Sequence, residues 1–380
     1  MNKALRIVSA HITAVLIVGL AVGGVVLTDR SAPTAADFGA QTEPFYGIHQ
    51  NGIETGGQAN LTLIAFDLKS GVDKAAAARF MRVWTTDAAK LTQGLPITED
   101  VDPGMEKNPA RLTATFGFGY SFYEKLGLTD KWPIEMQKIP AYPKIDKLQK
   151  RWSDGDIVVQ IGGNDPLSIY HLGEVLKIDA TPFATVKWQQ RGFVNAAGVN
   201  TGVTGRNLMG QMDGSGNPVP GTNNFQQAVW DADNGSVMVV RRIEMNLELW
   251  NSKSLKNKGE SVGRNIADGK PLYGGTEKAE IIKSKLPANS HVRLSERSAL
   301  GRIFRHGYNY DDGYTVSGAR DAGLIFVSFQ ESLRRYLDIQ NALAKIDALN
   351  KYTTPIGSGL YYVPKGLTSQ DEWLMQDFLN

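Results

Sequence analysis

The sequence predicts an α+β fold made of two units with a similar layout. Segments with the pattern of strands alternate with segments with the pattern of helices, without the regular rhythm of a parallel sheet. Two such layouts follow one another, which indicates a duplicated ferredoxin-like unit with antiparallel sheets and helices. The 380 residues, 42% of them hydrophobic, are enough for about two to three domains with large cores.

In the first unit, three apolar segments are typical of strands and two longer segments are typical of helices. Gly57 and Gly71 bound the first strand, Asp73 lies near the start of the first helix, and Pro166 stands in the first turn of the second. The expected strands are 60–68, 111–119 and 156–163, and the expected helices are 73–94 and 166–178.

The second unit repeats this arrangement. We expect a strand to begin within 235–250, a second strand at 323–330 and an amphipathic helix at 334–350. A Gly- and Asn-rich stretch at 195–210 is the expected boundary, which gives an N-terminal domain at 41–204 and a C-terminal domain at 205–380.

The composition excludes several classes of protein. A formal net charge of +2 argues against a nucleic-acid partner, because such proteins usually present a strongly basic face. The absence of cysteine excludes disulfides, zinc–thiolate sites, iron–sulfur clusters, cysteine nucleophiles and covalently attached c-type haem. Any metal must therefore be held by carboxylates, tyrosines or the histidines, which are His11, His49, His171, His291 and His306.

Residues 1–40 are interpreted as an export signal or an uncleaved N-terminal membrane anchor. Lys3 and Arg6 precede the uncharged run 12–28, and Ala36 lies in a small, polar segment that suits cleavage. The basic end is expected to stay inside, so the rest of the chain is expected to be exported to the periplasm, the cell envelope or the medium.

Three polar residues are candidates for chemistry. Asp213 is a lone carboxylate in a glycine-rich loop, where an Asp-Gly turn is the alternative interpretation. Arg305 follows two apolar residues, a position that suits a buried anionic site, although a surface ion pair is the alternative. His291 opens a polar segment, and a single histidine is more often structural than catalytic.

Together these residues fit the activation of peroxide on haem. One imidazole binds the iron. On the opposite side, an acid–base moves a proton between the two peroxide oxygens, and a cation stabilises the charge that develops as they separate. A carboxylate suits the first role and a guanidinium the second.

The motifs around these residues resemble the dye-decolorizing peroxidases, within them the exported deferrochelatase/peroxidase branch. The resemblance runs from about residue 45 to about residue 365. Gly210, Gln211, Met212, Asp213 and Gly214 match the G-x-x-D-G signature, and His291 and Arg305 match the haem-ligand histidine and the distal arginine. The segments 45–53, 239–250, 262–275 and 352–364 also resemble this branch.

The resemblance implies two tandem ferredoxin-like domains that enclose a pocket for non-covalently bound haem b. It implies that His291 binds the iron, and that Asp213 and Arg305 help hydrogen peroxide to form a ferryl intermediate, which then oxidises organic reductants such as dyes and phenols. Contacts to the haem or its pocket are expected for Asn207, Arg206 and Arg320. The alternatives are haem iron acquisition, with an iron-uptake transporter as partner, and a non-catalytic haem-binding protein.

Three features depart from the pattern of the family. Single basic residues replace the usual twin-arginine signal, and Gln211-Met212 replaces the commoner aromatic–basic pair of the signature. Many relatives have an aspartate that hydrogen-bonds the haem-ligand histidine, and Ser332 stands at the expected place. We therefore expect different tuning of His291, unless Glu331 or another acid substitutes.

Overall fold

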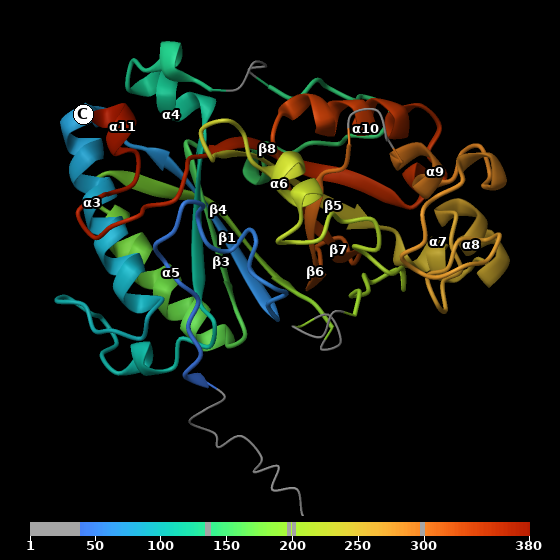
Figure 1. Cartoon of the computed structure of the whole chain (residues 1–380), viewed down its shortest axis with the longest axis horizontal. Coiled ribbons are helices and arrows are strands. Elements are labelled where there is room, and N and C mark those ends of the chain that lie inside the picture. The colour runs from blue at the N-terminus through green and yellow to red at the C-terminus, as the bar shows by residue number, and fades with distance from the viewer. Residues whose placement is uncertain (1–38, 134–137, 196–198, 200–202, 297–300) are drawn as a thin grey trace, which may run out of the picture. The chain divides into compact units, whose positions relative to one another are not determined.

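The computed structural model describes residues 39–133, 138–195, 199, 203–296 and 301–380 (Figure 1). Gly39–Asn380 form one compact unit. The predicted signal or anchor lies outside the described residues, apart from its last two positions. No helix in the described ranges is both long enough and apolar enough to cross a membrane.

The first half of the compact unit has the chain order βαββαβ. Antiparallel pairing arranges its strands as β4-β1-β3-β2, which is a ferredoxin-like sheet. The elements are β1 (Asn60–Leu68), α3 (Lys74–Leu91), β2 (Thr113–Gly119), β3 (Ile157–Gly163), α5 (Pro166–Ala180) and β4 (Ala184–Phe193), with the short helix α4 (Tyr120–Lys125) after β2.

The second half repeats this strand order as β8-β5-β7-β6, again with antiparallel pairs. A long excursion with three short helices joins its first two strands. The elements are α6 (Asn223–Val229), β5 (Ser236–Met245), α7 (Leu247–Asn251), α8 (Leu255–Val262), α9 (His291–Ser295), β6 (Phe304–Tyr314), β7 (Arg320–Gln330), α10 (Leu333–Ile346), β8 (Thr353–Val363) and α11 (Gln376–Leu379).

The two sheets join into one closed barrel within the described part of the chain. Few residues form the seams: Phe118 and Gly119 of β2 pair with β8, and Phe193 of β4 pairs with Asn309 of β6. The barrel interior is apolar, with Leu63, Val240 and Phe329 among its buried members. The predicted duplicated ferredoxin-like fold is therefore confirmed, and the closed barrel is an addition to it.

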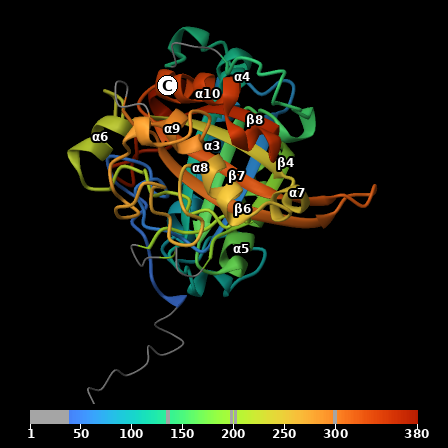
Figure 2. The same cartoon turned by 90° about the vertical axis from the view of Figure 1, so that its right-hand side faces the viewer.

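Helices cover the outer faces of the two sheets differently. In Figure 1, α3 and α5 lie side by side against the first sheet, and their core includes Phe80, Trp84 and Leu172. On the second sheet, α10 packs against β7 while the excursion with α7, α8 and α9 lies beyond it, toward the viewer in Figure 2. This second outer face is where the polar residues singled out in the sequence come together.

Local signals explain where the helices begin. The Asp73 side chain accepts a hydrogen bond from the Ala76 amide and starts α3, and Asp165 does the same for α5, directly before Pro166. The segment predicted to begin as a strand within 235–250 is strand β5 as far as Met245 and turns into α7 after the Asn246 cap.

Candidate active site

A cavity of about 240 Å³ lies between the outer face of the second sheet and α9 and α10. Its walls bring together three residues that are far apart in the chain: Asp213, His291 and Arg305. Many of its other side chains are apolar, among them Met209, Ile243, Met245, Leu324, Phe326, Ile339 and Leu343. The cavity therefore combines a hydrophobic slot with a few polar groups, which is typical of a cofactor site.

His291 is the first residue of α9 and is oriented by a carboxylate. Its Nδ1 lies 2.7 Å from Oδ2 of Asp347, whose Oδ1 accepts a hydrogen bond of 2.9 Å from the Leu349 amide. Since the carboxylate accepts a hydrogen bond from Nδ1–H, the lone pair of the other ring nitrogen, Nε2, is available to a metal. Ser332 supplies no carboxylate, and Asp347, directly after α10, is the other acid that substitutes for it.

A glycine allows α9 to sit close to α8. Gly263 follows α8 with φ of +93°, and a β-carbon there would lie 3.0 Å from Oγ of Ser290 and 3.3 Å from Cβ of Val292. A larger residue would be strained by this backbone conformation and would also push against the residues on either side of His291. The close packing of α8 on α9 therefore depends on glycine.

Asp213 sits in a tight loop that positions its carboxylate. Its amide donates to the Gly205 carbonyl at 2.9 Å, and Gly210 and Gly214 take φ values of +78° and +120°. Across the cavity wall, Gly307 of β6 leaves room for the carboxylate, because a β-carbon there would lie 3.2 Å from Oδ2 of Asp213. The glycines of the signature thus serve the placement of one acid.

Arg305 neutralises this acid from β6. Its Nη1 lies 3.3 Å from Oδ1 of Asp213, and the two side chains are 26% and 18% exposed. Asn217 fixes the arginine in two ways: its Oδ1 accepts from Nε of Arg305 at 3.3 Å, and its Nδ2 donates to the Arg305 carbonyl at 2.8 Å. The sequence analysis did not identify Asn217, although it belongs to the same glycine-rich segment as Asp213.

Asn207, Arg206 and Arg320, the other residues expected to contact the haem or its pocket, make mainly structural contacts. Asn207 lines the cavity, but its Oδ1 accepts from the Met209 and Gln211 amides and so shapes the loop. The guanidinium of Arg206 donates to three backbone carbonyls at 2.6–2.7 Å, and it does not line this cavity. Arg320 pairs with Asp311 on the exposed β6–β7 hairpin. Arg206 thus holds the loop and lines the adjoining outer pocket, whereas Arg320 lines neither space.

Other arginines line the cavity instead. Arg264 is 6% exposed and donates to the Gly269 and Glu277 carbonyls, and burial lowers the pKa of its guanidinium. Arg241 is 2% exposed and pairs with Asp146. Its position inside the apolar strand segment 236–245 is a sequence signal that could have singled it out, because a charge there needs a buried partner.

The cavity fits an iron porphyrin better than a bare metal ion. Among the described residues, no group of three or more His, Cys, Asp or Glu side chains could hold a metal ion. A single imidazole suits an iron whose other ligands come from a macrocycle, and the apolar walls suit the macrocycle itself. Arg241 and Arg264 supply positive charge that fits its carboxylates.

Comparisons with known proteins agree with this arrangement. Residues 50–194 match the family model of the Dyp-type peroxidase N-terminal part, and residues 204–368 match that of the C-terminal part. A dye-decolorizing peroxidase of Thermobifida fusca (strain YX) is 33% identical over 386 residues, which cover 92% of this chain and 86% of that protein. A deferrochelatase of Escherichia coli (strain K12) is 32% identical over 386 residues, with coverage of 90% and 89%.

Solved structures agree in fold as well. Ferric DtpA from Streptomyces lividans has a TM-score of 0.86 and 36% identity, covering 91% of this chain and 99% of that one. A DyP-type peroxidase from Cellulomonas bogoriensis has a TM-score of 0.85 and 34% identity, covering 90% and 99%. The molecule is thus a haem-dependent peroxidase of α+β fold. The chain belongs to the Dyp-type peroxidase family.

Proposed function

We propose that the chain binds haem b in the cavity, where Nε2 of His291 would hold the iron, and that Asp213 and Arg305 would act on hydrogen peroxide there. The observation that carries this proposal is that all three side chains line one cavity. The absence of cysteine supports a non-covalent haem, since the c-type attachment needs thiols. When bound, haem supplies the redox chemistry that peroxide reduction and reductant oxidation require.

Asp347 holds His291 in one orientation for this role. The 2.7 Å contact between Nδ1 and Oδ2 fixes the tautomer and raises the basicity of Nε2. The carboxylate is 4% exposed, so little water competes for the contact. The pair therefore gives the iron an electron-rich ligand.

Asp213 and Arg305 have different roles in the reaction with peroxide. The Asp213 carboxylate is placed to accept a proton from one peroxide oxygen and to return it to the other. The Arg305 guanidinium stabilises the negative charge that develops as the oxygens separate. Asn217 holds the guanidinium beside the carboxylate through the contacts of 3.3 and 2.8 Å, so the two groups meet the same small molecule. Organic reductants such as dyes and phenols would supply the two electrons that the reduction of hydrogen peroxide to water consumes.

Haem iron acquisition is the second candidate function. It is supported by the relatives named deferrochelatase, which are about as similar to the chain as the dye-decolorizing peroxidase. In this case iron would pass to an iron-uptake transporter. Incubation with haem in the absence of peroxide distinguishes the two, because only iron removal from an intact macrocycle releases free protoporphyrin.

An exported location is part of the proposal. It is supported by Lys3 and Arg6 before the uncharged run 12–28, which suit a cleaved signal or a membrane anchor. Fractionation of cells that express the full chain tests this, and N-terminal sequencing of the exported protein reports whether the segment is removed.

An absorption spectrum of the purified full chain, before and after one equivalent of peroxide, tests the main proposal. We expect a Soret band that changes with peroxide, peroxide-dependent dye oxidation, and haem that is extracted intact by acidified organic solvent. His291→Ala is expected to lose the haem or its ferric spectrum. A normal spectrum in that variant would contradict the ligand assignment, and a Soret band without dye oxidation would favour a haem carrier.

A further inference from the structure

A second, outer pocket adjoins the haem cavity at the acid–guanidinium pair. It has a volume of about 440 Å³. It shares Asp213 and Arg305 with the haem cavity but does not include His291. A molecule in the outer pocket therefore meets the pair without passing the iron-ligand side. The two spaces also share Asn207, Ser215, Lys278 and Leu324.

One rim of the outer pocket is the segment 55–58, which precedes β1. Gly56 and Gly57 are its exposed central residues, and neither has a side chain with which to anchor itself. Their backbone must therefore be held by other groups if the width of the pocket is to stay fixed.

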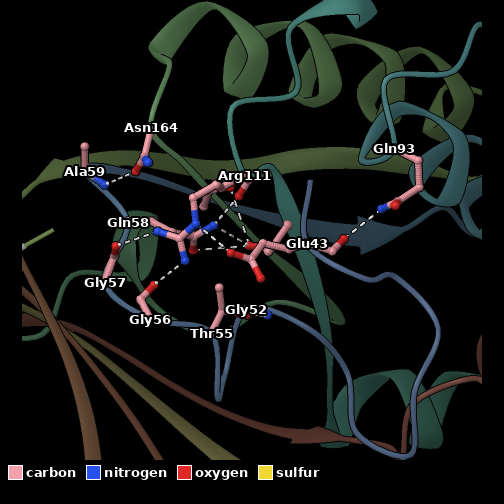
Figure 3. Close-up of polar contacts among 12 residues, drawn as sticks. Glu43, Gly52, Thr55, Gly56, Gly57, Gln58, Ala59, Gln93, Arg111 and Asn164 are labelled. Atoms are coloured by element: carbon pink, nitrogen blue, oxygen red, sulfur yellow. Dashed lines mark hydrogen bonds and ion pairs between the residues drawn. The ribbon is translucent and has the colours of Figure 1, made fainter. Parts of the chain in front are cut away.

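Arg111 provides this anchor, as the centre of Figure 3 shows. Its Nη1 donates to the Gly57 carbonyl at 3.1 Å, and its Nη2 donates to the Gly56 carbonyl at 3.3 Å. Its Nε lies 2.6 Å from Oε1 of Glu43. The arginine side chain is 7% exposed, so these charge-assisted contacts are largely shielded from water.

The backbone around Arg111 is unusual for residues other than glycine. Ala110 and Arg111 have φ values of +47° and +62°, in the left-handed region. Their amides are held by the Gly39 and Gln41 carbonyls at 2.8 and 2.6 Å. Such strain persists where the surroundings fix it, and it often marks a functional position.

The same network reaches the floor of the outer pocket. Gln58 donates from Nε2 to the Arg111 carbonyl at 2.6 Å, and its own carbonyl accepts from the Tyr308 hydroxyl at 3.2 Å. Tyr308 lies on β6, the strand that carries Arg305. Burial raises the pKa of Tyr308, and the nearby Arg111 guanidinium opposes this rise. One network therefore connects Glu43, the rim and the strand beneath it.

We propose that Arg111 and Glu43 are positioning residues that hold the rim 55–58 in place and so set the size of molecule that reaches Asp213 and Arg305 through the outer pocket. The inference rests on the proposed function, because it assigns a size limit to the same site. Neither residue lines the outer pocket or the haem cavity, so their effect is exerted through the rim.

The test compares small and bulky molecules on the haem-loaded full chain. Arg111→Asn removes the guanidinium and keeps a residue that tolerates the left-handed backbone. Glu43→Gln removes the charge of the partner and keeps its shape. The control is Lys125→Met, which loses an ion pair of 2.6 Å with the buried Asp156 in the same half of the molecule but lines neither cavity.

Two ratios are measured for each variant. One is the association rate of imidazole relative to cyanide with the ferric form, followed by the Soret shift, and the other is kcat/KM for tert-butyl hydroperoxide relative to hydrogen peroxide. We expect Arg111→Asn to raise both ratios about fivefold or more, because losing charge-assisted hydrogen bonds frees the rim. Glu43→Gln is expected to raise them less, and the control is expected to leave them unchanged.

Ratios are used because partial unfolding of a variant lowers the two rates in each ratio equally and so leaves the ratio unchanged. Unchanged ratios in Arg111→Asn and Glu43→Gln would overturn the size limit, and so would an equal rise in Lys125→Met. A wild-type chain that binds no haem would instead defeat the proposed function, and the inference with it. If Arg111→Asn fails to fold, Glu43→Gln alone decides the outcome.

Discussion

Replacing Asp347 with Asn is expected to make the haem iron easier to reduce. Asp347 accepts two hydrogen bonds, from His291 Nδ1 at 2.7 Å and from the Leu349 amide at 2.9 Å. An asparagine has one oxygen for these two donors, so its NH₂ group must face one of them. Either the histidine loses its acceptor or the turn after α10 does, and in both cases the negative charge behind the imidazole disappears.

The size of the effect follows from the kind of contact that is lost. A hydrogen bond to a charged group contributes about 1.5–3 kcal/mol. This stabilisation is assigned to the ferric state. Its loss then raises the reduction potential by about 60–130 mV, since a tenfold change in the equilibrium constant of a one-electron couple corresponds to 59 mV. Catalytic activity is expected to fall about 10- to 100-fold, as with other groups that orient a metal-bound histidine.

A spectroelectrochemical titration of the purified variant measures this shift. The chain offers a matched control in Asp100→Asn, because His171 Nε2 lies 2.7 Å from Oδ1 of Asp100 and both side chains are buried, yet neither lines the haem cavity. The control is expected to lose stability and keep its potential. An unchanged potential in Asp347→Asn with a normal Soret band would refute the reasoning, and so would an equal shift in the control.

Further predictions concern the peroxide side and the pH dependence of stability. Arg305→Leu is expected to slow the reaction with peroxide about 10²-fold or more in stopped-flow experiments, and a loss below tenfold would contradict its role. Asp213→Asn is expected to slow it less, and an unchanged rate would contradict its role as acid–base. Burial lowers the pKa of His306 to about 4, so stability falls as the pH drops from about 6.5 to about 4, by at most about 3 kcal/mol. His306→Gln should flatten this fall in urea unfolding at pH 7 and pH 5, and an equally steep fall would exclude His306 as its cause. Burial, and then Asp87, raises the pKa of Asp179 to about 7, so its charge destabilises the fold as the pH rises from about 4 through 7. Asp179→Asn is expected to gain about 1 kcal/mol in thermal unfolding at pH 8, and less at pH 5; a loss at pH 8 would contradict this.

Local signals allowed much of the fold to be predicted. The Asp73 cap and Pro166 mark helix starts within the sequence itself, and the structure confirms both. Strand β4 was missed, because Lys187, Gln190 and Arg191 break its apolar pattern and much of it is exposed. A strand of this kind is recognised only when its pairing with β1 is known.

The site, like the fold, could be predicted from the sequence only in part. Asp213, His291 and Arg305 carry recognisable motifs, and the structure brings them to one cavity. Asp347 and Asn217 were not predicted as their partners, because a hydrogen bond between distant segments leaves no local pattern. Arg206 was predicted to contact the haem because it lies close to the Asp213 motif. Its guanidinium instead donates hydrogen bonds to backbone carbonyls.

The closing of the barrel and the assembly of the site depend on the same residue. Asn309 of β6 pairs with Phe193 of β4 at the seam between the two halves, and it is 5% exposed. Its side chain donates to the Arg206 carbonyl at 3.1 Å and accepts from the Leu208 amide at 2.8 Å, so it also holds the loop that carries Asp213. Arg305 lies on the same strand. The acid and the guanidinium both belong to the second half of the chain, and they meet where β6 closes the barrel against β4 of the first half.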